Sequence, residues 1–371
     1  MSKKYGITIN DIHFGIRDSK RLYDELLSVF KPFILNHPEV EFIFFNGDFF
    51  DHKLTLCEPE SLYAMLFFKE IFDIAKERNI AIRMIQGTRS HEMNQLEIFR
   101  SYELENSKGT NFKIFNTVTE ETLNGIKFLY IPEEYPVDAD EYYKQYRENK
   151  YDIIFGHGTW DFVAQQGQTE HGNRKDTYSA PVFSWNEWKD SVDAFISFGH
   201  IHGRNKYGNK IFYSGSFTRW NFGERSAKGF TYFSIDPETK EYSVEFIDND
   251  VAPRYDVLSA AELNIENLPT DDLIKILDEE VKRSDNLRID FVNISEENLA
   301  IIKNYYKENP KVKVELRKKK TFLQESADTE RFKKWHYITK RTLPLDKTIQ
   351  KYCKEELNTD FTLEEIKNVI S

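Results

Sequence analysis

Short groups of acidic residues and histidines recur along the first 203 residues of the chain. They are Asp-Ile-His at 11–13, Gly-Asp-Phe-Phe-Asp-His at 47–52, Ser-His-Glu at 90–92, Gly-His-Gly at 156–158 and Gly-His-Ile-His-Gly at 199–203. In Asp-x-His and His-x-His, both side chains lie on the same side of an extended chain, so both can reach one ion. Carboxylate and imidazole together suit manganese, iron or zinc better than calcium. The five groups together predict a metal site.

The chemistry that such a site supports depends on how many ions it holds. A carboxylate can bridge two ions about 3.5–4 Å apart, and Asp48 is placed for that role. An ion pair of this kind polarises a phosphoryl group and lowers the pKa of a bridging water, which makes hydroxide available near neutral pH. A single Asp-x-His is more often structural. The order of all five groups, beside small residues that let the backbone turn, favours the metal interpretation.

Each group follows a segment predicted to be a strand. Residues 5–10, 41–48 and 81–87 are predicted strands, and helical patterns at 20–35 and 60–77 separate them, which indicates an α/β layered sheet. Beyond residue 110 the predicted strands come closer together, as in a mixed sheet or two packed sheets. Carboxyl ends of strands form the ligand crevice of open α/β sheets, so the five groups are expected to converge.

Composition limits the class of protein. The 371 residues suit one large domain with one or two small ones, and 40% are hydrophobic. No apolar run approaches the ~20 residues of a membrane span, so we expect no membrane association. Cys57 and Cys353 give no disulfide framework, which favours the cytoplasm. The net charge of −11 would repel nucleic acid, so any such binding must come from local basic patches or bound metal.

The C-terminal third differs from the rest. Strand, helix and strand patterns at 286–316, with the helix opened by Ser295, predict a small βαβ domain. Residues 317–351 hold eleven Lys or Arg against four Asp or Glu, with interleaved aromatics, which fits phosphate contacts with stacking or an ordinary solvated linker. An amphipathic helix is predicted at 345–357, and Thr362 with Glu365 predicts a capping box before a final helix.

In this order the motifs resemble those of the calcineurin-like metallophosphoesterase superfamily, D-x-H, G-D-x-x-D, G-N-H-(D/E), G-H and G-H-x-H, over residues 5–235. The resemblance implies an α/β four-layer sandwich of mixed β-sheets flanked by helices. It implies a first ion held by Asp11, His13, Asp48 and His202, and a second held by Asp48, His157, His200 and the asparagine of the third motif. His91 would be the general acid, and Asp51 would be the acid that orients a histidine ligand.

The third motif reads Gly-Thr-Arg-Ser-His-Glu at 87–92 and has no asparagine. Alignment on His91 puts Ser90 at the asparagine position, whereas alignment on Gly87 puts Thr88 there and displaces His91. The sequence favours Ser90, because His91 and Glu92 then keep the positions of the histidine and the acid in the family motif. A serine hydroxyl is a shorter and weaker donor than a carboxamide. We therefore expect a second ion that binds only at millimolar metal, with Mn²⁺ as the expected ion and Mg²⁺, Fe²⁺ and Zn²⁺ as alternatives.

The segment 212–236 contains a Tyr-x-Gly-Ser strand, an aromatic and Phe-Gly-Glu loop, and Lys-Gly-Phe before another strand. In this pattern it is similar to the SbcD nuclease and the phage recombination-endonuclease subunits. That resemblance implies a nuclease domain at 1–255, a small βαβ capping domain at 256–320 that could contact DNA, and a basic linker with amphipathic helices at 321–371. It further implies that the C-terminal helices bind an SbcC-type coiled-coil ABC ATPase. It implies a homodimer, for which the 60–77 helix is a candidate surface, although core packing explains that helix equally well. Candidate contacts to substrate are Arg89, His52 and Arg219.

The motifs are compatible with three functions. The leading prediction is a metal-dependent DNA phosphodiesterase that acts with an ATPase partner in end processing, repair or recombination, as exonuclease or endonuclease. The second function is that of a small-molecule phosphatase or phosphodiesterase. The capping domain and the basic tail argue against it, because a small substrate needs neither. A non-catalytic scaffold that tethers DNA is favoured by the missing asparagine, but Asp11, Asp48, His91 and His202 oppose it.

Overall fold

A computed structural model describes residues 2–16, 18–103, 111–165, 182–317, 345–356, 361–363 and 365–366. The chain divides into two compact units. The first holds Met1–Leu258, Ile274–Arg288 and Glu308–Lys313, and the second holds Ser259–Leu273, Ile289–Lys307 and Val314–Ser371. The domain boundaries expected near residues 255 and 320 remain predictions.

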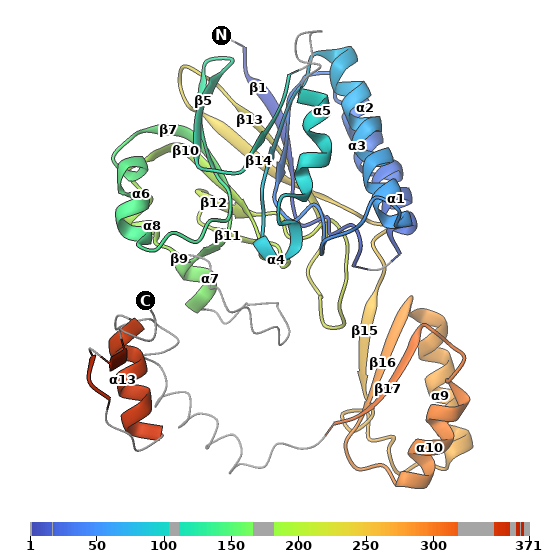
Figure 1. The fold of residues 1–371 in the computed structure, drawn as a ribbon. Coiled ribbons are helices and arrows are strands. Elements are labelled where there is room, and N and C mark those ends of the chain that lie inside the picture. Colours follow the sequence, from blue (N-terminus) through green and yellow to red (C-terminus); the bar gives the residue numbers. More distant parts are fainter. Residues whose placement is uncertain are drawn as a thin grey trace. The chain divides into compact units, whose positions relative to one another are not determined.

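The first of two six-stranded sheets contains the three strands predicted near the N-terminus (Figure 1). Its order is β14 (Tyr242–Asp248), β13 (Gly229–Ile235), β1 (Lys4–Ile9), β2 (Val40–Asn46), β3 (Ala81–Ile85) and β4 (Phe112–Phe115). Strands β1 to β4 are parallel, whereas β13 runs antiparallel to both β1 and β14. The carboxyl ends of β1, β2 and β3 therefore lie at the same end of the sheet.

The second sheet is also mixed. Its order is β11 (Asn205–Tyr207), β12 (Ile211–Tyr213), β10 (Val192–Gly199), β7 (Tyr151–His157), β6 (Ile126–Ile131) and β5 (Thr119–Leu123). Strand β10 is parallel to both β7 and β12, and β6 is parallel to β7. Strand β5 was not predicted, because its sequence Thr-Glu-Glu-Thr-Leu lacks an apolar run and it lies at a sheet edge. Beside this sheet, β8 (Thr159–Trp160) pairs with β9 (Val182–Phe183).

Helices α1 (Ser19–Ser28), α2 (Phe30–Asn36) and α3 (Pro59–Arg78) cover the outer face of the first sheet. The sequence predicted one helix at 20–35, but the structure has two that meet at Val29. Pro32 has no N–H to donate to the preceding turn, which accounts for the interruption. Helices α6 (Ala139–Arg147) and α8 (Trp185–Trp188) cover the second sheet. Shorter helices are α4 (Arg89–Glu92), η1 (Gln95–Phe99), α5 (Arg100–Glu103) and α7 (Asp161–Gln165).

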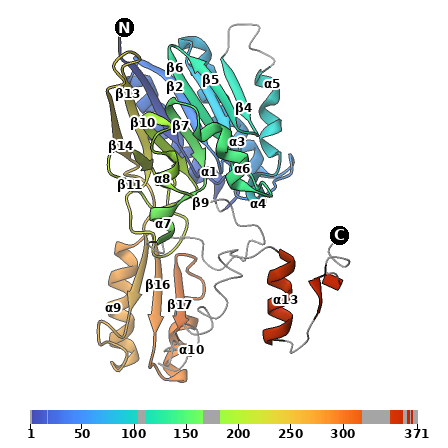
Figure 2. The ribbon, with the colours of Figure 1, turned by 90° about the vertical axis from the view of Figure 1, so that its left-hand side faces the viewer.

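Three apolar clusters join these layers. One lies between the first sheet and its helices, one between the second sheet and its helices, and one between the two sheets. In the cluster between the sheets, Phe44 of β2 stacks on Phe155 of β7 with ring centroids 4.0 Å apart. Figure 2 shows the two sheets from the side of the second sheet's helices. The predicted four-layer sandwich of mixed sheets flanked by helices is therefore confirmed.

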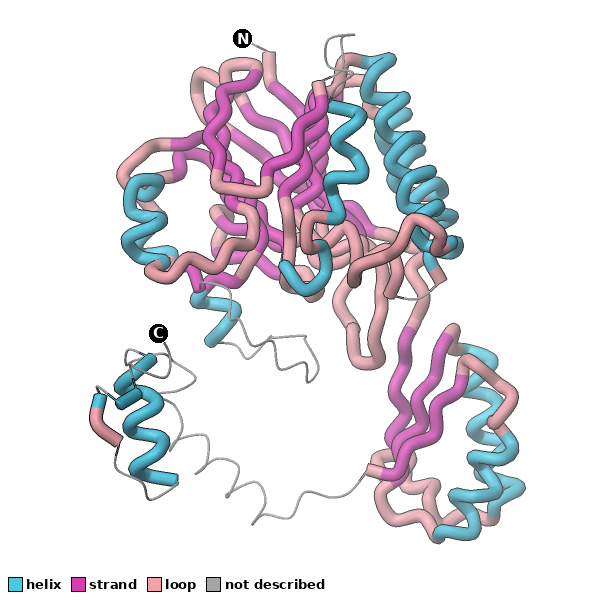
Figure 3. Tube along the Cα trace, viewed as in Figure 1, coloured by secondary structure: helices cyan, strands magenta, loops and turns pink. Residues whose placement is uncertain are grey.

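A separate three-stranded sheet follows, with the order β15 (Tyr255–Ser259), β16 (Asn286–Phe291) and β17 (Val312–Leu316). Strand and helix alternate along this part of the chain (Figure 3). The predicted strand, helix and strand are present as β16, α10 (Glu296–Tyr305) and β17, and Ser295 caps α10 by accepting from the Asn298 amide at 3.2 Å. Strand β15 and helix α9 (Thr270–Arg283) were not predicted.

Two predictions for the C-terminal segment are confirmed. Helix α13 spans Leu345–Glu356, and its Cys353 is buried. The capping box is formed, because Glu365 accepts from the Thr362 amide at 2.8 Å and the Glu365 amide donates to Thr362 Oγ1 at 3.3 Å. Residues 318–344, the core of the predicted basic segment, lie outside the described residues, as does Leu357. In the described part of the chain, no helix has both the length and the apolarity needed to cross a bilayer.

Replacing Phe155 by alanine tests the packing between the sheets. The Phe155 side chain is fully buried, so Phe155→Ala should lower the free energy of unfolding by about 3–5 kcal/mol through lost burial and a cavity. Urea denaturation measures this change. Val137→Ala, at a fully exposed side chain, should change the same quantity by less than about 0.5 kcal/mol. Equal stabilities of the two variants would contradict the inter-sheet core.

Candidate metal centre

Four of the predicted ligands have left-handed backbone conformations. The φ angles are 50° at Asp11, 58° at His13, 51° at Asp48 and 92° at His200. Such a conformation costs on the order of 1–3 kcal/mol at a non-glycine residue and persists only where neighbouring structure imposes it. Here the Asp11 amide donates to Gly47 O at 3.2 Å, the His13 amide to Asp48 O at 3.0 Å, and the His200 amide to Asp11 Oδ1 at 2.8 Å. These bonds hold the side chains at the strand ends in fixed directions.

Asp11, His13 and His202 form the first cluster of candidate ligands, and all three are buried. The Nε2 atoms of His13 and His202 are 2.9 Å apart. Asp11 Oδ2 is buried and makes no hydrogen bond to any described residue. A buried carboxylate oxygen without a donor is costly unless a cation approaches it. The cluster therefore fits a divalent ion, as the sequence predicted.

Two carboxylates lie behind the histidines of this cluster. Asp51 Oδ1 is 3.5 Å from His13 Nδ1, and Glu224 Oε1 is 3.9 Å from His202 Nδ1. Burial raises the pKa of Asp51, but the hydrogen bond and charge of His13 outweigh it and lower the pKa to about 2. Asp51 therefore lies beside a candidate ligand, and its role of orienting that histidine stays a prediction.

Glu224 is a site residue that the sequence did not single out. It is buried with Lys228, whose ammonium lies 2.8 Å from Glu224 Oε2 and donates to His202 O at 2.7 Å. Burial raises the pKa of Glu224, but His202 and Lys228 outweigh it and lower the pKa to about 2. The signal for Glu224 in the sequence is the Phe-Gly-Glu and Lys-Gly-Phe pattern at 222–230, which lies within the segment 212–236 that carries the narrower resemblance.

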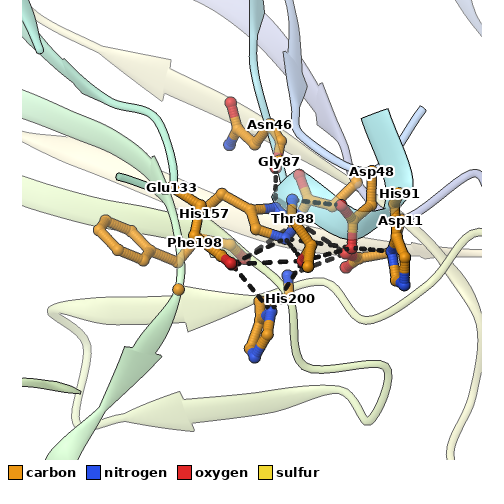
Figure 4. Close-up of polar contacts among 12 residues, drawn as sticks. Asp11, Asn46, Asp48, Gly87, Thr88, His91, Glu133, His157, Phe198 and His200 are labelled. Atoms are coloured by element: carbon orange, nitrogen blue, oxygen red, sulfur yellow. Dashed lines mark hydrogen bonds and ion pairs between the residues drawn. The ribbon is translucent and has the colours of Figure 1, made fainter. Parts of the chain in front are cut away.

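Asp48, His157 and His200 form the second cluster (Figure 4). Asp48 Oδ2 lies 3.2 Å from His157 Nε2 and 3.8 Å from His13 Nε2, which places this carboxylate between the two clusters. His157 Nδ1 is 2.8 Å from the carbonyl oxygen of Asn46. The contact to a carbonyl places a proton on Nδ1 and points Nε2 at the cluster, as in histidine ligands of metal sites.

The third motif contributes Thr88 to this cluster in place of the predicted Ser90. Thr88 is buried, its amide donates to Asp48 Oδ1 at 2.6 Å, and its hydroxyl is 3.4 Å from both His157 Nε2 and His200 Nδ1. Ser90 is exposed on α4. The loop is therefore longer than the family motif by Arg89 and Ser90, which form a helical turn between Thr88 and His91. Both sequence alignments were partly right, because the turn keeps Thr88 and His91 in the site together.

His91 lies beside residues of both clusters. Its Nδ1 is 3.1 Å from Asp48 Oδ2, and its ring meets the His13 ring edge-on, with centroids 5.1 Å apart. Burial lowers the pKa of His91, but the carboxylate of Asp48 outweighs burial and raises the pKa to about 9. His91 is therefore protonated at neutral pH when no ion is bound.

Glu92 fastens the second and third motifs together. Its side chain is fully buried and accepts from the amides of Phe49 and Gly87, both at 2.6 Å. The two loops approach so closely that a Cβ atom at Gly87 would lie 2.2 Å from the Asp48 nitrogen, and one at Gly47 would lie 2.3 Å from His157 Nδ1. Glycine at 47 and 87 is thus required by the contact.

The candidate substrate contacts are placed differently from one another. Arg89 is exposed on α4, and His52 is half exposed with Nδ1 3.1 Å from Asp51 Oδ2. Arg219 donates to Ala252 O at 3.3 Å and to Ser226 O at 3.1 Å, so its guanidinium braces two loop carbonyls. Glu133, absent from the sequence prediction, is buried beside Thr88, His157 and His200.

Comparisons with known proteins agree with this geometry. Residues 7–204, more than half of the chain, match the family of calcineurin-like phosphoesterases. No curated protein matches the chain. One crystal structure aligns with 66% of this chain and 100% of its own, at 14% identity and a TM-score of 0.40. A glutamine-dependent NAD⁺ synthetase from Acinetobacter baumannii, solved with ADP, aligns with 94% of this chain and 70% of its own, at 9% identity and a TM-score of 0.34. These two TM-scores are too low to inform the function.

Metal affinity should rise with pH. Burial lowers the pKa of His157, but Asp48, Asp11 and Glu133 outweigh it and raise the pKa to about 10, so His157 must lose a proton to bind an ion. Below that pKa, each proton released makes Mn²⁺ binding up to about tenfold tighter per pH unit. Calorimetry in two buffers of different ionisation enthalpy, between about pH 6.5 and 8.5, measures the affinity for Mn²⁺ and the number of protons released on binding. Affinity that is independent of pH, without proton release, would contradict this expectation.

Replacing Glu92 by glutamine should separate the two loops that it joins. The carboxamide can accept only one of the two amide N–H groups, so Glu92→Gln should lower the free energy of unfolding by about 1–3 kcal/mol. Urea denaturation with and without Mn²⁺ provides the measurement. Glu77→Gln, at an exposed position of α3, is the matched control and should have no measurable effect. If Glu92→Gln and the native protein were equally stable, the hydrogen bonds of Glu92 would not stabilise the contact between the two loops.

Proposed function

The chain belongs to the calcineurin-like phosphoesterase family, and from that premise we propose that it is a two-metal-dependent DNA nuclease. It hydrolyses phosphodiester bonds in DNA end processing, repair or recombination. Its proposed partner is an SbcC-type coiled-coil ABC ATPase. Mn²⁺ is the proposed native ion.

The donor set accounts for metal-dependent hydrolysis. Asp11, His13, Asp48 and His202 would hold one ion, and Asp48, His157, His200 and Thr88 would contribute to the other. When bound, two such ions supply Lewis-acid polarisation of a phosphoryl group and an activated water. The left-handed backbone at four of these residues keeps their side chains in place before any substrate arrives.

His91 is the proposed proton donor for the leaving oxygen. It is the titratable residue of the third motif whose ring contacts both Asp48 and His13, so it lies beside both clusters. In the metal-free protein the adjacent carboxylate favours the protonated imidazole, which is the form that a general acid requires. The exposed Arg89, two residues earlier, could contact a phosphate of the DNA at the rim of the site.

The observation that carries the assignment to nucleases is the contact of Glu224 and Lys228 with His202. Both residues come from the segment 212–236 that resembles SbcD-type nucleases. Their buried ion pair lies against the imidazole and the carbonyl of a candidate ligand. This placement supports a functional likeness, because burying an ion pair is costly and this pair lies directly against a candidate ligand.

The proposed protein partners rest on apolar helix surfaces. Helix α13 has the amphipathic pattern expected of a segment that binds the base of a coiled coil. On α3, Leu62, Met65 and Leu66 are 54%, 38% and 38% exposed, while Ala64, Phe67, Phe68 and Ile71 face the core. An outer stripe of this kind supports homodimerisation through α3.

Replacing His91 by alanine tests the assignment. The native protein with Mn²⁺ should degrade linear duplex or single-stranded DNA, and His91→Ala should slow cleavage by about 10²–10⁴-fold, because the leaving oxygen loses its acid. A gel assay with end-labelled DNA measures the rates. His37→Ala, whose ring stacks on Phe33 away from the clusters, is the control and should cleave at the native rate.

Other results would point to other functions. Hydrolysis of bis-p-nitrophenyl phosphate without DNA cleavage would indicate a small-molecule phosphodiesterase. DNA binding without cleavage of either substrate would indicate a scaffold that tethers DNA.

A further inference from the structure

We propose that Glu133 is a ligand of the second metal position, where its carboxylate takes the place of the carboxamide that the third motif lacks. The inference rests on the two-metal site of the proposed function, and it adds a ligand that the family motifs do not contain. Glu133 lies in the sequence Ile-Pro-Glu-Glu-Tyr-Pro at 131–136, just after β6.

The backbone fixes Glu133 beside the third motif. Its amide donates to Gln86 O at 3.1 Å, so it is joined to the residue that precedes Gly87 and Thr88. The side chain is only 2% exposed and points into the cluster, opposite Asp48 (Figure 4). The second sheet thus supplies an acidic oxygen at the point where the loop of the first sheet has only a threonine hydroxyl.

The distances fit a shared ion. Glu133 Oε2 lies 3.3 Å from Thr88 Oγ1, 3.3 Å from His200 Nδ1 and 3.8 Å from His157 Nε2. Two donors that each lie about 2.1 Å from one ion, at angles between 90° and 109°, are about 3.0–3.4 Å apart. A single oxygen atom of Glu133 therefore has ligand-like spacing to Thr88 Oγ1 and His200 Nδ1, and it lies slightly farther from His157 Nε2.

The other oxygen of Glu133 is already occupied. The hydroxyl of Tyr135 donates to Glu133 Oε1, which leaves Oε2 directed at the histidines. A hydrogen bond to the far oxygen of a carboxylate is the usual way in which a protein orients a carboxylate ligand. Tyr135 is two residues away on the same loop, so orientation and ligand come from one short segment.

Charge explains why a carboxylate belongs here. Glu133 and Asp48 are both buried, and Thr88 hydrogen-bonds to both, so two acidic groups face one small space. A buried pair of carboxylates is unfavourable unless positive charge lies between them. With Glu133, the donor set carries one more negative charge than a set completed by asparagine. The second ion is then expected to bind well below millimolar concentration, in contrast to the expectation based on a hydroxyl alone.

Manganese binding to matched variants tests the proposal. The variants are Glu133→Gln, the control Glu134→Gln, and the double variant Glu133→Gln/Thr88→Asn. Glu134 is the neighbouring carboxylate and accepts from the Tyr142 hydroxyl at 2.8 Å, outside the cluster. Calorimetry gives the number of ions and their dissociation constants, and electron paramagnetic resonance of Mn²⁺ reports whether two ions are coupled. Thermal unfolding of the metal-free proteins checks that each variant folds.

The native protein and Glu134→Gln should bind two coupled ions. Glu133→Gln should keep one ion at native affinity and bind the second at least about 10–100-fold more weakly, with the coupled signal lost at equal Mn²⁺. The double variant should regain part of that affinity, since it restores the carboxamide. Two coupled ions at native affinities in Glu133→Gln would overturn the proposal, as would a native protein that binds fewer than two.

The experiments can disprove the proposed ligand and the proposed nuclease activity independently of each other. If the native protein binds two ions, loses the second in Glu133→Gln and yet degrades no DNA, then Glu133 is a ligand and the proposed nuclease is wrong. If DNA is degraded while Glu133→Gln binds both ions as tightly as the native protein, the nuclease stands and the ligand is wrong.

Discussion

The buried carboxylate of Asp48 is the constraint on which the rest of the centre depends. It has no exposure to solvent, yet an amide, a hydroxyl and two imidazoles approach it from separate parts of the chain. An uncompensated charge in such surroundings is strongly unfavourable, so hydrogen-bond donors, protonated histidines or metal ions have to lie beside the carboxylate. The left-handed backbone at Asp11, His13 and Asp48 and the close contact of Gly47 with Gly87 bring these groups to the carboxylate.

The two sheets share the task of surrounding Asp48. Loops of the first sheet supply Asp11, His13, Thr88 and His91, whereas loops of the second sheet supply Glu133, His157, His200 and His202. The distance between these two groups is set by aromatic side chains between the sheets, among them Phe44, Phe128 and Phe155. Close packing of large rings leaves little freedom for one sheet to move relative to the other. The apolar core thereby fixes the geometry of polar atoms at its edge.

The sequence was sufficient where local pattern and local structure agree. Apolar runs predicted the central strands, and short motifs at their ends predicted Asp11, His13, Asp48, His157, His200 and His202 as neighbours, which they are. It was insufficient where tertiary contacts decide. Strand β5 contains two glutamates and no apolar run but pairs with β6, and α9 lies in a part of the chain where the sequence has no motif. Glu133 and Glu134 are adjacent and chemically identical, and only the tertiary structure, in which the Glu133 amide donates to Gln86 O, shows which carboxylate lies at the site. Ser90 was favoured over Thr88 because a sequence alignment cannot show that two inserted residues form a turn.

The division of the donor atoms between two sheets has a mechanical consequence. Ions bound at this end of the sheets would connect the carboxyl ends of two layers that pack through an apolar core and a few hydrogen bonds, and so would act as removable cross-links of the sandwich. Binding free energy at such a junction is also folding free energy. The concentration of free divalent metal around the protein would then set its resistance to unfolding and proteolysis, as well as its readiness to act.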